Sequence, residues 1–91
     1  MKNINVGLYK KKHKEHSYLI VITKVPDSKD MYVCSEYSAE GGWNDLLICS
    51  EACIENYYAY ISDCRDRDKL PIDILEVIPE VHSRLDKVKH A

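Results

Sequence analysis

The sequence predicts a small α+β domain in which a mostly antiparallel sheet of three to five strands packs against one main helix, followed by a short C-terminal helix. Three observations predict this fold class. The run Ser17–Val25 is rich in β-branched residues on both faces, as in a central strand. Apolar residues recur at helical spacing after Ser50. With 91 residues there is room for one core only, so residues 1–91 are assigned to a single domain.

The N-terminal half predicts an antiparallel meander. The short apolar stretch Asn3–Tyr9 predicts a first strand, and the polar, lysine-rich segment before Ser17–Val25 predicts a hairpin loop. Pro26–Asp30 predicts a turn, because proline lacks a backbone donor while Asp and Ser bond their own backbone. The alternating run Met31–Tyr37 then predicts the next strand.

The main helix has two competing starts. Either Ser50 is its N-cap and Asp45–Cys49 forms a short strand, or Asn44 is the N-cap and the helix runs straight through. Both alternatives predict an amphipathic helix that reaches the charged run before Pro71. Its apolar stripe consists of Cys53, Tyr57, Tyr60 or Ile61, and Cys64.

Two further elements are expected near the C-terminus. Ile72–Ile78 is a strand candidate, and its Asp and Glu place it near a sheet edge. Pro79 opens a last short helix, since proline is favoured at a first helical position. The apolar stripe of that helix is Val81, Leu85 and Val88, and a helix this short needs docking to persist.

Cysteine usage and the lack of export signals predict a cytoplasmic protein. No run approaches the roughly 20 apolar residues of a membrane span, and no apolar signal core follows the charged N-terminus. The four cysteines are therefore expected to be reduced thiols that pack like small hydrophobic residues. Zinc binding by Cys49, Cys53 and Cys64 is a weaker hypothesis, because structural zinc sites pair their ligands in turns. We expect neither a metal nor a cofactor.

Composition and motifs favour binding over catalysis. The sequence contains no glycine-rich phosphate loop, no G-x-S-x-G elbow and no H-E-x-x-H, so we do not expect an enzyme. Phe is absent beside seven Tyr and one Trp, and we expect most of these tyrosines in the core. Exposed aromatic residues among charges are where binding energy concentrates. The expected contact region for a protein partner therefore consists of Glu40, Trp43, Asp45, Glu55, Tyr58, Asp63 and Asp66.

Charge is distributed unevenly along the chain. Residues 25–91 carry fourteen acidic and seven basic side chains, which favours a basic protein partner such as a nucleic-acid enzyme. Residues 1–24 carry six lysines against Glu15 alone. The alternative function is therefore a nucleic-acid-binding accessory that uses Lys10, Lys11, Lys12, Lys14 and Lys24. A homo-oligomeric structural protein, possible as a homodimer, is a third hypothesis.

Residues 17–78 resemble the HicB-like antitoxin domain, a degraded ribonuclease H-like fold. The resemblance lies in the order strand, turn, strand, loop, helix, proline, strand. The residues that carry it are Tyr18, Ile20, Ile22, Asp27, Tyr32, Val33, Ser50, Glu51, Ala52, Glu55, Asn56 and Pro71. Ser38–Asp45 replaces the family's proline- and glycine-marked loop, and the family's separate DNA-binding segment is missing. The resemblance implies a stoichiometric inhibitor that masks a nucleic-acid enzyme, as an antitoxin or a phage anti-CRISPR protein does.

Overall fold

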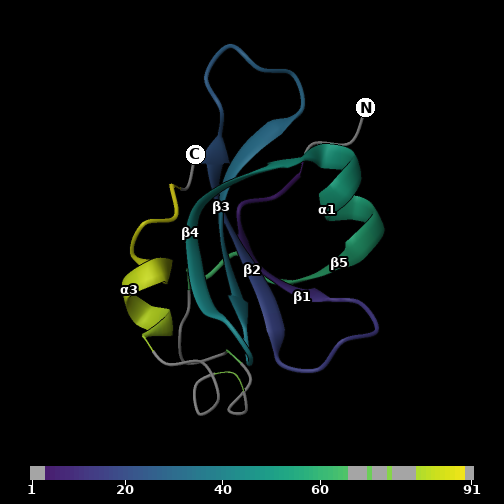
Figure 1. Cartoon of the computed structure of the whole chain (residues 1–91). Helices are drawn as coiled ribbons and strands as arrows, with labels where there is room; N and C mark the ends of the chain where they lie inside the picture. The colour runs from purple at the N-terminus through teal and green to yellow at the C-terminus, as the bar shows by residue number, and fades with distance from the viewer. Residues whose placement is uncertain (1–3, 66–69, 71–73, 75–79, 90–91) are drawn as a thin grey trace.

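A computed structural model describes residues 4–65, 70, 74 and 80–89. Its centre is one antiparallel sheet of five strands with the spatial order β4-β3-β2-β1-β5 (Figure 1). The strands are β1 (Gly7–Lys11), β2 (Ser17–Lys24), β3 (Met31–Ser38), β4 (Gly42–Ser50) and β5 (Tyr58–Ser62), and the helices are α1 (Glu51–Tyr57) and α3 (Val81–Leu85). The predicted antiparallel sheet with a short C-terminal helix is therefore confirmed.

The central strand and its two hairpins agree with the sequence prediction. The first six residues of β2 are all buried, because β1 and β3 flank the strand and both of its faces are covered. In the turn before β3, the Val25 N–H donates to the Met31 carbonyl at 2.8 Å, and the Met31 N–H donates to the Ser28 hydroxyl at 3.0 Å. These bonds close the hairpin that Pro26 begins.

The first strand lies later in the chain than Asn3–Tyr9. β1 includes Lys10 and Lys11, and Lys10 pairs with Tyr18. A strand needs backbone partners on its neighbours, whereas lysine side chains lie along a sheet with their charges in water. Lys10 and Lys11, which were predicted to lie in the hairpin loop, are therefore part of its first strand.

The start at Ser50 is the correct one of the two alternatives. The Ser50 hydroxyl accepts a hydrogen bond from the Cys53 N–H at 3.1 Å, as in an N-cap, and Ser50 ends β4. The Glu51 N–H donates to the Asp30 carbonyl at 2.7 Å and ties this helix end to the β2–β3 turn. The segment Asp45–Cys49 is thus part of a strand, and that strand is longer than expected.

The predicted extent of the main helix is wrong. α1 ends at Tyr57, and the next five residues form β5, which pairs with β1. Only Ile54 is buried in α1, whereas Tyr57 of the predicted stripe is 58% exposed. The free edge of β1 offers ladder hydrogen bonds to a segment rich in Tyr and Ile, and this pairing prevails over helical periodicity.

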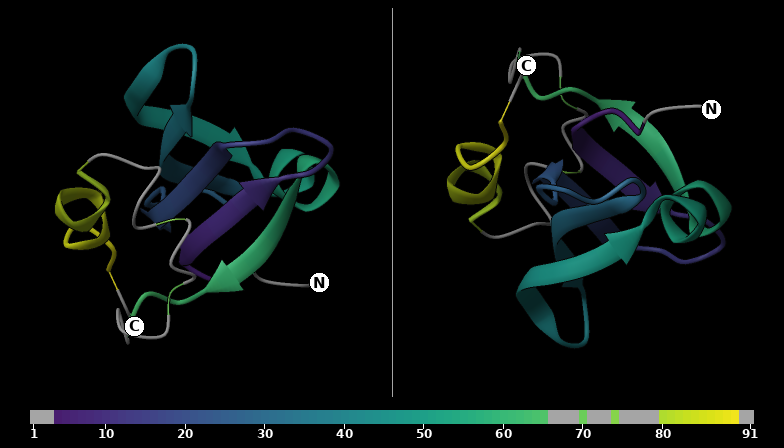
Figure 2. Two further views of the ribbon diagram at one scale, coloured as in Figure 1. Left: turned by 90° about the horizontal axis from the view of Figure 1, so that it is seen from below. Right: turned by 90° about the horizontal axis from the view of Figure 1, so that it is seen from above.

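Two buried clusters lie on opposite faces of the sheet. α1 contributes Ile54 to one of them, and α3 contributes Val81 and Leu85 to the other. The two helices accordingly lie on opposite sides of the sheet (Figure 2). The main helix therefore covers only part of one face, and the second face is covered by the C-terminal segment.

The sheet curls around the face that carries α1. The Tyr58 hydroxyl on β5 donates to the Glu36 carboxylate on β3, although β1 and β2 lie between these strands. On a flat sheet three strand spacings amount to about 14 Å, beyond the reach of a Tyr and a Glu side chain that point the same way. This face is therefore the concave one.

The predicted C-terminal helix is present, but it begins at Val81 with Glu80 as its N-cap and not at Pro79. Val81, Leu85 and Val88 are all buried, and the Lys89 N–H donates to the Ile22 carbonyl at 2.9 Å. Of the predicted strand Ile72–Ile78, the structure describes only Ile74, which is helical and buried in the same cluster, so the strand prediction is wrong at this residue. Pro71 and Pro79 lie outside the described residues. No helix in the described part of the chain is long and apolar enough to cross a membrane.

Candidate protein-binding site

β5 is an edge strand whose outer side carries no charge. It lies at the end of the sheet, and among the described residues no strand pairs with its outer side. Its sequence Tyr58–Ser62 contains neither a charged residue nor proline. Natural proteins usually protect edge strands with lysines, prolines or covering segments, because an open edge is a template for another strand. The β5 edge is therefore the first candidate for a binding surface.

Aromatic side chains are exposed along this edge. Tyr57 is 58% and Tyr60 is 46% exposed, whereas the other five tyrosines are buried. The Tyr60 ring packs edge-on against Tyr9, with centroids 5.3 Å apart, so it is held in place although one side faces water. Partial burial, followed by the nearby Asp63 carboxylate, raises the pKa of the Tyr60 hydroxyl. Tyr60 thus presents a positioned, neutral aromatic group with a polar end.

The backbone of Tyr60 is directed away from the sheet. The Lys12 N–H donates to the Tyr57 carbonyl at 2.8 Å, and the strands continue with Lys10 opposite Ala59 and Tyr9 opposite Tyr60. Hydrogen-bonded and non-hydrogen-bonded pairs alternate in an antiparallel ladder. Ala59 therefore bonds to β1, and the N–H and carbonyl of Tyr60 face the open side.

Two cavities open beside Tyr60. Both are lined by Ile4, Asn5 and Tyr60. One, of about 400 Å³, continues to Asp63, Arg65 and Lys89, and the other, of about 480 Å³, continues to Tyr9, Tyr58 and the end of α1. Recesses on both sides of an exposed aromatic ring offer places for the side chains of an added strand.

β5 itself is anchored from the inside. Gly7 has a φ of +131°, and a Cβ at this position would lie 2.2 Å from the Ser62 carbonyl oxygen. Only glycine allows the two backbones to approach so closely. On the concave face, burial and then the hydrogen bond to Glu36 raise the pKa of the Tyr58 hydroxyl. Tyr58 therefore stays protonated and holds β5 over the sheet.

The expected contact region does not form one patch. Trp43 and Asp45 lie on β4 beside α3, Glu55 is exposed on α1, and Tyr58 is buried on the concave face. Glu40 is in the β3–β4 loop, where it pairs with Lys14 at 3.5 Å. Asp63 follows β5 and pairs with Arg65 at 3.3 Å, and Asp66 lies outside the described residues.

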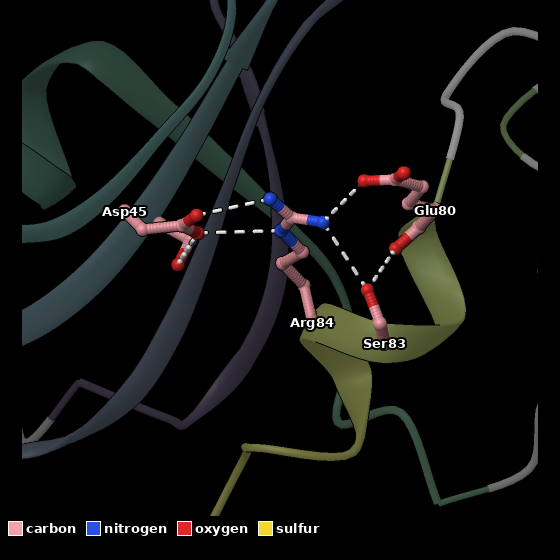
Figure 3. A network of polar contacts seen from close by, with 5 residues as sticks. Asp45, Glu80, Ser83 and Arg84 are labelled. Carbon is pink, nitrogen blue, oxygen red and sulfur yellow. Dashed lines mark hydrogen bonds and ion pairs between the residues drawn. The ribbon is translucent and has the colours of Figure 1, made fainter.

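Asp45 and Trp43 attach α3 to the sheet. Arg84 donates to both carboxylate oxygens of Asp45, at 3.3 and 2.9 Å, and to Glu80 at 2.8 Å (Figure 3). The guanidinium carbon lies 4.6 Å from the centroid of the Trp43 ring, as in a cation–π contact. The hydrogen bonds from Arg84 lower the pKa of the Asp45 carboxyl. These two residues thus already have a structural role.

The five lysines proposed for nucleic-acid binding are dispersed. Lys10, Lys11 and Lys12 lie at the end of β1, whereas Lys24 ends β2 at the opposite end of the sheet. The Lys12 ammonium donates to the Glu55 carbonyl at 3.1 Å, and Lys14 pairs with Glu40. These lysines therefore do not share one basic face.

Three of the four cysteines gather under α1. The hydrogen bond to the Cys49 thiol, followed by burial, raises the pKa of Cys34, and Cys53 lies close to both. Cys64 lies in the cluster on the other face, with a φ of +67° that places it outside any helix. No group of three or more Cys, His, Asp or Glu within the described residues is arranged to hold a metal ion.

Sequence reasoning missed the β5 edge because it assigned these residues to the helix. The signal was present in the run Tyr57–Ile61, whose three tyrosines and one isoleucine favour a strand. Comparison with family models, with curated proteins and with solved structures gave no match to this chain. The resemblance to the HicB-like antitoxin domain therefore stays a prediction.

Proposed function

We propose that this chain is a non-enzymatic protein-binding module that accepts a strand of another chain at the β5 edge. The observation that carries the proposal is the position of Tyr60 on the edge strand β5. Its aromatic side chain is exposed, and its backbone N–H and carbonyl are directed away from the sheet. In strand addition, such backbone groups supply affinity and the recesses for alternate side chains supply specificity. Ile4, Asn5 and Tyr60 line recesses of this kind.

The biological role that we propose is inhibition of a nucleic-acid enzyme, as by an antitoxin or an anti-CRISPR protein. The excess of seven acidic side chains over residues 25–91 supports it, since an acidic chain meets a basic enzyme quickly and repels the enzyme's nucleic acid.

Site-specific photo-crosslinking in the native host tests the binding surface. A benzoylphenylalanine at position 60 is expected to give a light-dependent protein adduct. The matched control is the same group at position 48, because Ile48 is similarly exposed, at 51%, but lies on β4 at the opposite edge. Adducts of equal yield from both positions, or none from position 60, would contradict the proposal.

A further inference from the structure

We propose that Cys49 and Cys34 form a modification site, where hydrogen peroxide oxidises Cys49 and Cys34 then closes a disulfide with it. The two thiols lie in the buried cluster to which α1 contributes Ile54, on the concave face of the sheet. They are separate from the outward N–H and carbonyl of Tyr60, and the site therefore does not depend on the proposed function.

The pairing of β3 with β4 makes Cys34 and Cys49 neighbours. In the register of the two strands, Tyr32 lies opposite Cys49. Cys34 lies two residues further along β3, so the two cysteines are diagonal neighbours on the same face of the sheet. The fold thus holds the two sulfurs on adjacent strands, close enough for the thiols to share a hydrogen bond.

The contact between the two thiols makes Cys49 the more reactive one. The hydrogen bond from Cys34 lowers the pKa of Cys49, against the smaller opposing effects of burial and of the Glu36 carboxylate. The same bond, followed by burial, raises the pKa of Cys34, which therefore stays protonated. Because the thiolate and not the thiol is the nucleophile, Cys49 is the sulfur that attacks a peroxide. Cys49 is also the more accessible of the two, at 8% exposed against 0% for Cys34.

Cys53 is the third thiol under α1 and the competing partner for Cys49. It lies in the first turn of the helix, where its N–H donates to the Ser50 hydroxyl at 3.1 Å. Burial, followed by the nearby Cys49, raises the pKa of the Cys53 thiol. The hydrogen bond of the Cys49 thiol is made with Cys34. Cys34 is therefore the sulfur that is in place to react with an oxidised Cys49.

The reaction balances with hydrogen peroxide as the oxidant. The Cys49 thiolate attacks one peroxide oxygen, the O–O bond breaks, and the leaving hydroxide takes a proton from solvent to become water. The Cys34 sulfur then attacks the sulfur of the Cys49 sulfenic acid. An S–S bond forms, and the leaving hydroxide takes the Cys34 proton as a second water. The two sulfurs together lose two electrons, and the peroxide gains them.

Hydrogen peroxide treatment of the purified full-length chain, followed by peptide mapping without reduction, tests the site. The expected product is a disulfide between Cys34 and Cys49, with a mass lower by about 2 Da for the two hydrogens lost. Cys64 is the matched control, because it is 7% exposed against 8% for Cys49 and lies in the cluster on the opposite face. In the folded chain Cys49 is expected to be oxidised roughly tenfold faster than Cys64, and in urea the two rates are expected to become equal.

Cys53→Ser distinguishes the two partners that Cys49 could take. This variant is expected to form the same disulfide at the wild-type rate, and the mapping of the wild type decides the question if the variant unfolds. A disulfide between Cys49 and Cys53, or between any other pair, overturns the proposal. So does a folded chain in which Cys49 and Cys64 are oxidised at equal rates, or one that keeps all four thiols under conditions that oxidise the urea-unfolded chain.

Discussion

The two edges of the sheet are protected in different ways. On β4, which is the other edge strand, the side chains of Asp45 and Trp43 are engaged by Arg84 of α3. On β5, the structure describes the close approach of Gly7 to Ser62, the hydrogen bond from Tyr58 to Glu36, and the Tyr58 N–H that donates to the Ile54 carbonyl of α1. The outer side of β5 is left with exposed tyrosines.

This difference shows how stability and binding are separated in a small domain. The contacts that stabilise β5 do not use the outward N–H and carbonyl of Tyr60, so these groups are available to another chain. The contacts at β4 use the acidic and aromatic side chains that would otherwise mark a binding surface. The charged and aromatic residues Trp43 and Asp45, which predicted a binding surface, therefore have a structural role on β4. The uncharged segment β5 forms the edge that we propose as the binding surface.

The largest effect is expected from breaking the inner anchor of β5. Gly7→Ala forces a side chain against the Ser62 carbonyl at a φ that only glycine adopts readily. We expect the free energy of unfolding to fall by about 2–4 kcal/mol, measured by urea titration. Gly41→Ala is the control, because there a Cβ meets only the Ser38 hydroxyl, at 3.1 Å. Equal losses in the two variants would show that the close approach of Gly7 to Ser62 does not stabilise β5.

An intermediate effect is expected at the concave face. Tyr58→Phe removes the hydroxyl that donates to Glu36 and leaves that half-buried carboxylate without this donor. A loss of about 1–3 kcal/mol follows. The neighbouring Tyr57→Phe removes a hydroxyl from an exposed ring and should leave the thermal midpoint unchanged. If Tyr58→Phe melts like the wild type, the curl of the sheet does not depend on this bond.

The smallest effect is expected at the β4 edge, and it depends on pH. Arg84 lowers the pKa of Asp45 in the folded chain, so the contact stabilises the fold above the unfolded pKa near 3.9. This stabilisation is lost as pH falls through the folded pKa. Because a third of the Asp45 side chain is exposed, the change is at most about 1 kcal/mol.

Urea titrations of Asp45→Asn at pH 6 and pH 3 measure this contribution. The variant should lose less stability on acidification than the wild type does. Glu40→Gln removes a carboxylate that is 76% exposed and should behave as the wild type. If Asp45→Asn kept the wild-type acid sensitivity, the ion pair between Arg84 and Asp45 would not contribute to the pH dependence of stability.

Local chemistry in the sequence determined the elements whose partners are close in the chain. Ser17–Val25 predicted β2, Pro26 and Ser28 predicted the turn, and Ser50 was one of two predicted helix starts. The stripe of Val81, Leu85 and Val88 predicted the docked C-terminal helix. Each depends on a cap, a turn or an apolar face, which a few neighbouring residues specify.

Only the tertiary structure determined that residues 58–62 form a strand, and this strand carries the candidate site. These residues follow a helix directly and continue its period, but the edge of β1, about fifty residues earlier in the chain, offered them hydrogen bonds. Helical spacing is a local property, whereas strand pairing depends on a partner that the spacing does not reveal. The sequence therefore determined the sheet's centre, and contacts distant in sequence determined which edge stayed open.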